Sequence, residues 1–146
     1  MSICFLSLET SKIFNQLILD ELTAQGFEGL SGALIVLFPY IDEYQGITAT
    51  ALASKIGYTR QAMHKNLLKL ETLHYITFES GTNKKEKAVV LTQKGIDLMQ
   101  SATTFIEKTQ QELSNLLGEK TLQEYMECQY QIFTYLNEKS PGRMTL

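Results

Sequence analysis

The segment Ile47–Thr92, ITATALASKIGYTRQAMHKNLLKLETLHYITFESGTNKKEKAVVLT, contains the pattern that decides the fold. Leu52–Gly57 predicts a short helix that ends at a glycine, the residue that adopts positive φ without steric cost. A second helix is expected over about Thr59–Leu73, with its first threonine as N-cap. Met63, six residues after the glycine, is expected to fill the space between the two helices. The spacing therefore predicts a helix-turn-helix.

The second predicted helix separates apolar from polar side chains. Residues that recur at helical spacing give it a core face: Ala62, Met63, Leu67, Leu70 and Leu73. The side chains left on its other faces are polar or basic and are the candidate DNA-contacting groups: Thr59, Arg60, Gln61, His64, Lys65 and Lys69. A helix that lies in a major groove needs this division. An ordinary amphipathic helix with a solvated face is the alternative interpretation.

A predicted β-hairpin follows this helix directly. Tyr75–Glu79 is rich in β-branched and aromatic residues, Ala88–Leu91 is apolar, and the connection between them is polar and contains a glycine. Four residues in or beside the connection complete the candidate DNA-binding set: Asn83, Lys84, Lys85 and Lys87. A solvated hairpin would explain the same pattern. Because the basic tip follows a basic helix, we interpret the hairpin as a wing that contacts the same duplex.

The distribution of charge supports this interpretation better than the net charge does. The 146 residues carry a net charge of −3, which is unusual for a DNA-binding protein. From Lys55 to Lys94 there are eight Lys and Arg and three Glu, a net +5, whereas the rest of the chain carries five cationic and thirteen anionic residues, a net −8. Segregation of this kind directs one face toward phosphates while the remainder repels them.

These residues resemble the MarR family of bacterial transcriptional regulators. The resemblance rests on Ala53, Gly57, Met63 and Leu70-Glu71, on the hairpin, and on the Leu-Thr-x-x-Gly motif at Leu91–Gly95. It implies a mainly α fold with a small antiparallel β-wing, in which a winged helix-turn-helix is flanked by N- and C-terminal dimerisation helices. It also implies a DNA-binding regulator, a homodimeric repressor that reads a pseudo-palindromic operator in double-stranded DNA.

Three positions depart from the family pattern. Asn83-Lys84-Lys85 stands where the family commonly has Asp-x-Arg at the wing tip. His74 replaces the usual glycine before the wing strand, and Asn66 occupies a usually apolar position. These departures concern the wing tip, the entry to the wing and the packing of the second helix.

The remaining sequence predicts helices on both sides of the winged helix. They are expected over Ser2–Thr23, Leu30–Ile41, Thr92–Leu117 and Thr121–Glu138. The second of these is apolar all round and is expected to be buried on every side, with Pro39 kinking or ending it. Ile47 is expected to add a short third strand, and Thr48 and Thr92 to cap the helices that follow them. The chain is interpreted as one MarR-like domain, with a winged-helix core over about 30–92 and dimerisation helices over about 1–25 and 93–140.

The terminal helices carry apolar stripes longer than a monomer of this size covers easily. A two-fold dimer in which these helices interlock would bury the stripes and present two recognition helices to half-sites about one helical turn apart. A monomer with a compact helical cap is the alternative.

Catalysis, cofactors and metals find little support in the sequence. No glycine-rich phosphate loop or nucleophile–base motif is present, and His64 and His74 point to different faces of a helix, which makes them a poor metal pair. No run approaches 18 apolar residues, and the first residues lack a signal-peptide pattern, so a cytoplasmic protein with no membrane partner is expected. The competing function is a winged-helix protein-interaction module without sequence-specific DNA binding.

The resemblance suggests two ways of regulating such a protein. Many family members bind small aromatic or phenolic effectors between the dimer helices and the winged helix. Another branch senses peroxides with a cysteine in the first helix, and Cys4-Phe5 resembles its Cys-Phe motif, with Cys128 as a candidate resolving partner. Ile18 and Gly29 stand where that branch has tyrosines, and a structural cysteine is the commoner case.

Overall fold

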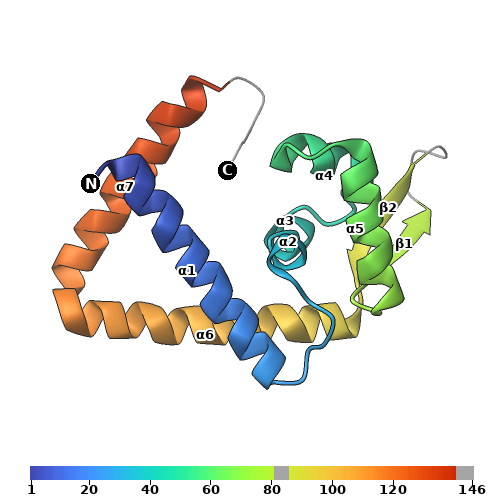
Figure 1. The fold of residues 1–146 in the computed structure, drawn as a ribbon, viewed down its shortest axis with the longest axis horizontal. Coiled ribbons are helices and arrows are strands. Elements are labelled where there is room, and N and C mark those ends of the chain that lie inside the picture. The colour runs from blue at the N-terminus through green and yellow to red at the C-terminus, as the bar shows by residue number, and fades with distance from the viewer. Residues whose placement is uncertain (81–85, 141–146) are drawn as a thin grey trace.

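The structure is a computed structural model that describes residues 1–80 and 86–140. Within these residues the elements follow in the order α1 (Ile3–Ala24), α2 (Gly32–Ile35), α3 (Phe38–Glu43), α4 (Ala49–Ile56), α5 (Arg60–Thr72), β1 (Ile76–Ser80), β2 (Lys87–Leu91), α6 (Gln93–Leu117) and α7 (Glu119–Glu138). The small elements α2 to α5 gather with the hairpin at one end of the molecule, and α1, α6 and α7 form an open frame at the other (Figure 1). The mainly α fold with a small antiparallel wing is confirmed.

Hydroxyl side chains begin four of the helices. Ser2, Thr48, Thr59 and Thr92 have extended backbone, and each accepts a hydrogen bond from the backbone N–H three residues later. Each cap satisfies a donor that has no partner within the helix. Gly57 ends α4 in the left-handed region at φ 84°, so the sharp turn between α4 and α5 forms as predicted.

The predicted helix over Leu30–Ile41 is wrong, because the segment forms α2 and α3 with a bend between them. Pro39 lies in the first turn of α3, where a missing N–H costs no helical hydrogen bond, so the proline helps to begin a helix rather than to end one. The expectation of burial on every side is also wrong, since Ala33 and Pro39 are exposed while Leu34 and Phe38 are buried.

The core of the winged helix forms where α5 crosses α4 and the hairpin. Met63, Leu67 and Leu70 of α5 have no exposed surface, and Met63 fills the space beside α4 as predicted. Tyr75, at the entry to the wing, is fully buried, and its ring meets that of Phe38 edge-on with centroids 5.7 Å apart. Ala62 was expected in this core, but α5 turns its methyl group to the surface.

The wing is a two-stranded antiparallel ladder in which Ile76 pairs with Leu91 and Ser80 with Lys87. The predicted third strand is reduced to a single bridge between Thr48 and Ala88, with the N–H of Val89 donating to the carbonyl of Ile47 at 2.8 Å. This contact holds the base of the wing against the start of α4.

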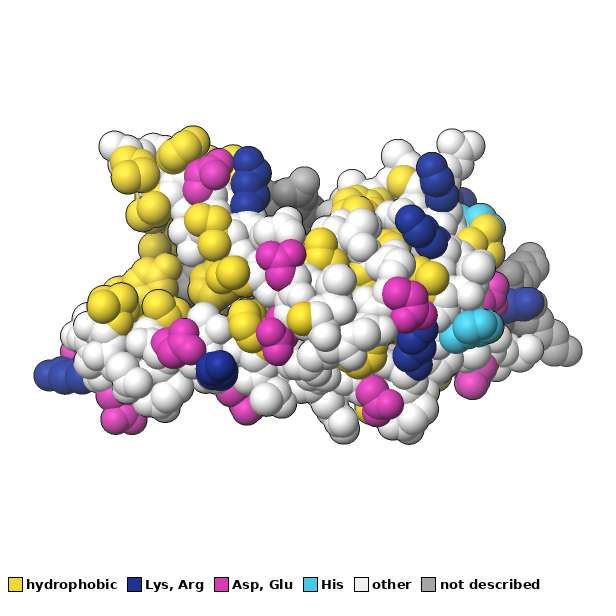
Figure 2. Space-filling model, turned by 60° about the horizontal axis from the view of Figure 1, so that its bottom comes forward, with side chains coloured by type: hydrophobic (Ala, Val, Ile, Leu, Met, Phe, Trp, Pro, Cys, Tyr) yellow, Lys and Arg dark blue, Asp and Glu magenta, His cyan; other side chains and the backbone are white. Residues whose placement is uncertain are grey.

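The frame of α1, α6 and α7 leaves many apolar side chains uncovered. Helix α6 runs along the bottom of the view, α1 crosses it, and α7 rises from its far end after Gly118 (Figure 1). The last helix begins at Glu119, two residues earlier than predicted. In the space-filling view, hydrophobic side chains gather over this half of the molecule (Figure 2). No helix of the described residues has the length and apolar character needed to cross a membrane.

Candidate nucleic-acid interface

Helix α5 turns a polar face away from its core. At 100° per residue, the positions opposite Met63, Leu67 and Leu70 are Gln61, Lys65, Leu68 and Thr72, with His64 and Lys69 beside them. All six of these side chains are exposed. Arg60 occupies the first position after the Thr59 cap and is exposed too. Of the sequence-predicted contacts on α5, Gln61, His64 and Lys65 therefore lie on the face away from the core, with Arg60 and Lys69 at its two sides.

Apart from Thr72, whose hydroxyl donates to the carbonyl of Leu68 at 2.9 Å, the polar side chains on this surface have no partners among the described residues. In residues 1–80 and 86–140 no hydrogen bond or ion pair engages the side chains of Arg60, Gln61, His64, Lys65 or Lys69. A long cationic side chain that is not tied to a carboxylate keeps its donors available for phosphate or base edges. The surface therefore offers unpaired donors on a rigid helix.

The described part of the wing carries one predicted contact at its base. Lys87 is exposed at the end of the ladder, opposite Ser80. Its neighbour Glu86 accepts a hydrogen bond from the hydroxyl of Thr50 at 2.8 Å, which ties the wing to the first turn of α4. The predicted contacts Asn83, Lys84 and Lys85 lie outside the described residues. The orientation of the wing base thus depends on α4.

Two cations that the charge analysis placed on the DNA face have other partners. Lys94 donates to the carboxylate of Glu28 and to the carbonyl of Leu73, both at 2.9 Å, and lies 4.4 Å from the centre of the Tyr75 ring. Lys55 lies 4.3 Å from the centre of the Tyr44 ring. The cations without an internal partner in the described part of this segment are Arg60, Lys65, Lys69 and Lys87.

Lys94 joins three parts of the chain at the C-terminal end of α5. It is on α6, Glu28 lies in the connection after α1, and Leu73 caps the C-terminal end of α5. A cation at that end also favours the helix dipole. The hydrogen bond from Lys94 holds the pKa of Glu28 below its usual value, whereas burial and the nearby Glu28 charge raise the pKa of Tyr75 to about 12. The hydroxyl of Tyr75 donates to the carbonyl of Glu28 at 2.8 Å.

These contacts of Lys94 with Glu28, Leu73 and Tyr75, here called the Lys94 junction, were not predicted from the sequence. The Leu-Thr-x-x-Gly motif marks its α6 side, where the hydroxyl of Thr92 donates to the carbonyl of His74 at 2.6 Å. Its other side, Glu28, is 66 residues from Lys94 in the sequence, and no periodicity or spacing connects the two. The motif therefore indicated where α6 begins, but not which residues Lys94 of α6 contacts.

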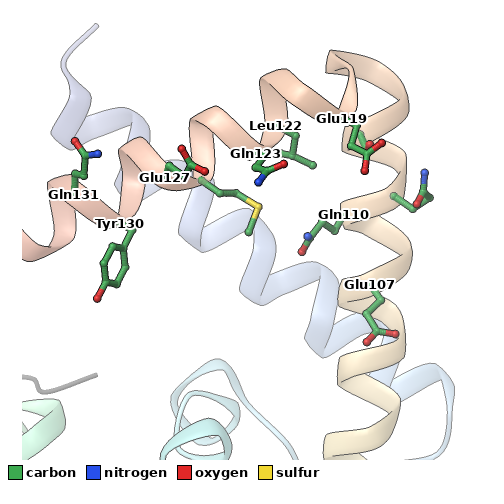
Figure 3. Close-up of a pocket in the computed structure, with 11 residues that line it drawn as sticks. Glu107, Gln110, Glu119, Leu122, Gln123, Glu127, Tyr130 and Gln131 are labelled. Carbon is green, nitrogen blue, oxygen red and sulfur yellow. The ribbon is translucent and has the colours of Figure 1, made fainter.

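A groove of about 800 Å³ opens between α6 and α7, at the opposite end of the molecule from the recognition helix (Figure 1). Gln110 and Glu107 of α6 and Gln123, Glu127 and Tyr130 of α7 lie along it (Figure 3). The groove is wide and lined by both polar and apolar groups, and it belongs to the frame of terminal helices rather than to the winged helix.

The two cysteines are both exposed and neither forms a disulfide. Cys4 lies in the first turn of α1, two residues after the Ser2 cap, and Cys128 lies in α7. Their redox role stays a prediction. In the described ranges, no three His, Cys, Asp or Glu side chains are grouped so that they would hold a metal ion.

Comparison with known proteins places this geometry among regulators of one fold. The sequence matches no protein-family model and no curated protein. Among solved structures, Staphylococcus aureus MepR in complex with DNA has a TM-score of 0.72 at 19% identity, over 93% of this chain and 98% of that one. A MarR transcriptional regulator from Methanosarcina mazei Go1 has a TM-score of 0.72 at 13% identity, over 90% and 91%. Staphylococcus aureus MarR in complex with salicylate and kanamycin has a TM-score of 0.75 at 19% identity, over 90% and 87%.

The chain therefore has the winged-helix fold with flanking helices seen in MarR-family regulators. The likeness extends over the terminal helices as well as the winged helix, because nine-tenths of the chain or more is covered in each comparison. At these identities the likeness concerns the fold.

Proposed function

We propose that this protein is a homodimeric DNA-binding transcriptional regulator of the MarR type, which represses by occupying a pseudo-palindromic operator. The observation that carries the proposal is the exposed surface of α5, where Arg60, Gln61, His64 and Lys65 have no hydrogen-bond or ion-pair partner among residues 1–80 and 86–140. Arginine and glutamine have the donor and acceptor patterns that match guanine and adenine edges in a major groove. The same fold is found in MepR, whose structure is of a complex with DNA.

The homodimer is proposed from the apolar surface of the terminal helices. In α1, Ile3, Leu6, Ile13 and Leu17 are each exposed by 44% or more of their surface, and Leu136 of α7 by 55%. A single chain that left such a surface in water would be prone to associate. A second copy brings the same surface, so a two-fold contact covers both at once. In this proposal a helix of the second copy lies in the groove between α6 and α7, whose lining residues are shown in Figure 3.

In this proposal the chain is one functional unit with two functions, DNA binding and dimerisation. The segment from about 30 to 92 binds DNA, and the helices over about 1–25 and 93–140 form the dimer and fix the separation of its two winged helices. Half-sites for such dimers lie about 34–36 Å apart, one turn of the duplex. The Lys94 junction links the DNA-binding part to the dimerisation helices, because Lys94 of α6 donates a hydrogen bond to the carbonyl of Leu73 at the end of α5.

A small aromatic or phenolic effector that releases the operator is part of the proposal. Its support is the shared fold with Staphylococcus aureus MarR, whose structure contains salicylate. Titrating salicylate into the protein–DNA complex and measuring release of the duplex tests this part separately.

Selection from a pool of random duplexes tests the proposed function. The full chain should enrich sequences with two inverted half-sites, and its affinity should fall steeply with salt because phosphate contacts release counterions. Arg60→Ala should lose about 1–3 kcal/mol of binding free energy and relax specificity at one base position.

Lys108→Ala is the matched control. Lys108 is an exposed cation on α6, far along the chain from α5, so its removal changes the net charge equally and should leave operator affinity unchanged. A chain that enriches no sequence, with weak binding that Arg60→Ala and Lys108→Ala reduce alike, would favour the protein-interaction module instead.

A further inference from the structure

One large apolar side chain is exposed on the polar face of α5. Leu68 keeps 42% of its surface exposed. Among the described residues between Leu17 and Ile96, no other large hydrophobic side chain is exposed to this degree. The other large exposed hydrophobics lie before or on α1, or on α6 and α7, where the dimer contact is proposed. The position of Leu68 therefore calls for a different explanation.

Leu68 belongs to the stripe of α5 that faces away from the core. It follows Gln61 by seven residues, His64 by four and Lys65 by three. Side chains with this i, i+3, i+4, i+7 spacing share one helix face and read bases together in other recognition helices. Leu68 lies about 12 Å from the first residue of α5 along the axis, by the rise of 1.5 Å per residue. A groove-bound helix therefore brings Leu68 to the duplex with the other three.

The surroundings of Leu68 fit DNA better than a protein partner. Its neighbours at i±3 and i±4 on the exposed face are His64, Lys65, Glu71 and Thr72, which are all polar or charged. A protein interface has an apolar centre made of several side chains, and a lone leucine among polar and charged side chains provides none. A duplex offers phosphates for Lys65 and, in the major groove, one apolar group that a leucine can cover: the C5 methyl group of thymine.

We propose that Leu68 is a specificity-determining residue that recognises a thymine in each half-site through its C5 methyl group. The inference deepens the proposed function and rests on it, since it requires α5 to lie in the major groove. It assigns the apolar part of base recognition to Leu68, while Gln61 and Arg60 supply the polar part.

The test uses duplexes in which single thymines are replaced by uracil. Uracil pairs as thymine does and differs only by the lost methyl group. The operator comes from the selection described above. Each half-site should contain one thymine whose replacement by uracil weakens binding of the wild type. Replacement in one half-site should weaken binding about fourfold, and replacement in both about fifteenfold, as expected for burial of one methyl group per half-site.

Leu68→Ala removes the side chain that covers the methyl group. This variant should bind the thymine operator more weakly than wild type does and should bind the thymine and uracil duplexes equally. Gln61→Ala is the matched variant on the same stripe: it should lose affinity yet keep the uracil penalty. Because Leu68 is exposed, Leu68→Ala should keep the thermal midpoint of the wild type.

The outcomes separate the two proposals. A wild type that discriminates between operators but binds every uracil duplex as tightly as the thymine duplex overturns the role of Leu68 and leaves the DNA-binding function intact. A uracil penalty of the same size in Leu68→Ala assigns the methyl contact to another side chain and also overturns the role of Leu68. Failure to select any sequence overturns the proposed function and the thymine contact with it.

Discussion

His74 has a left-handed backbone conformation that glycine adopts more easily than histidine. It is the one non-glycine residue of the described ranges with positive φ, at 67°, and it lies where MarR-type sequences commonly have glycine. Its backbone is held from both sides, since its N–H donates to the carbonyl of Glu71 and its carbonyl accepts from Thr92. The left-handed region costs an L-residue about 1–2 kcal/mol, so the turn that leads from α5 into the wing is strained.

Substitutions at His74 should therefore rank by backbone preference. We expect His74→Gly to raise the free energy of unfolding by up to about 1 kcal/mol, and His74→Val to lower it by about 1–2 kcal/mol, because a β-branched residue tolerates positive φ least. Urea unfolding at one protein concentration measures both. His64→Gly is the control, because glycine inside α5 should lower the free energy of unfolding by about 0.5 kcal/mol relative to histidine. A His74→Gly variant less stable than wild type would mean that the imidazole contributes more than the strain costs.

Individual residues were predictable where the chemistry is local. The caps Thr48, Thr59 and Thr92 and the turn at Gly57 each act within a few positions, and the sequence pattern located all four. The exposed position of Ala62 was not predicted, because apolar character alone does not say which side of a helix edge faces the core. The contact between Lys94 and Glu28 was invisible for the same kind of reason, since only the fold brings them together.

At the scale of elements, the junction behind α5 should make stability depend on alkaline pH. Tyr75 is fully buried, and its pKa is raised to about 12 from an ordinary value near 10. The folded state therefore holds the phenol proton more tightly than the unfolded state does. The resulting stability is complete below about pH 10 and is lost as the pH rises toward 12.

Chemical denaturation between pH 8 and 12 tests this dependence. Wild type should lose stability over the upper two pH units, and Tyr75→Phe should lose less there because it has no phenol to ionise. The variant should also be less stable at pH 8, by about 1 kcal/mol, for want of the hydrogen bond to the carbonyl of Glu28. Identical alkaline profiles for the two proteins would rule out Tyr75 as the responsible group.

The wing should contribute affinity more than specificity. Lysine is a compact, strongly hydrated cation, which suits phosphate contacts better than insertion into a narrow minor groove. Replacing Lys84, Lys85 and Lys87 together by Ala should lower the salt dependence of operator binding by about one unit for each lost phosphate contact, with the preferred sequence unchanged. Lys108→Ala again provides the control. An unchanged salt dependence in the triple variant would mean that the wing does not touch DNA.

Elements were predicted best where their hydrophobic period was clear. The long helices α1 and α6 and both wing strands formed within a few residues of the expected bounds. The segment 30–41 failed because a run that is apolar on all sides contains no period, so its bend had no signature. The hydrogen bond between Thr50 of α4 and Glu86 beside the wing was not predicted either, because the two residues are 36 positions apart in the sequence.

At the scale of the whole molecule, the winged helix and the frame place opposite demands on their surfaces. Among the described residues, the winged-helix end exposes cations and, of the large hydrophobic side chains, Leu68, whereas the frame exposes many apolar side chains along α1 and α7. Hydrophobic side chains are most concentrated over the frame in Figure 2. Burying one Leu or Phe contributes about 1.5–3 kcal/mol, so several anchors from each chain outweigh an association cost of 4–15 kcal/mol. Leu6 and Leu136 are each more than half exposed in the single chain, which makes them sensitive probes of a second copy.

Leu6→Glu combined with Leu136→Glu should therefore weaken dimerisation more than it destabilises the fold of a single chain. In a dimer the two charges would lie in an apolar seam, where desolvation without a partner is costly, whereas in a monomer they would remain in water. We expect the variant to sediment as a monomer or to unfold, and to lose binding to the two-half-site operator. Gln100→Glu with Thr103→Glu adds the same charge at exposed polar positions of α6 and should remain dimeric. A Leu6→Glu/Leu136→Glu variant that sediments as the wild type does and binds the full operator as tightly would exclude this surface from the dimer contact.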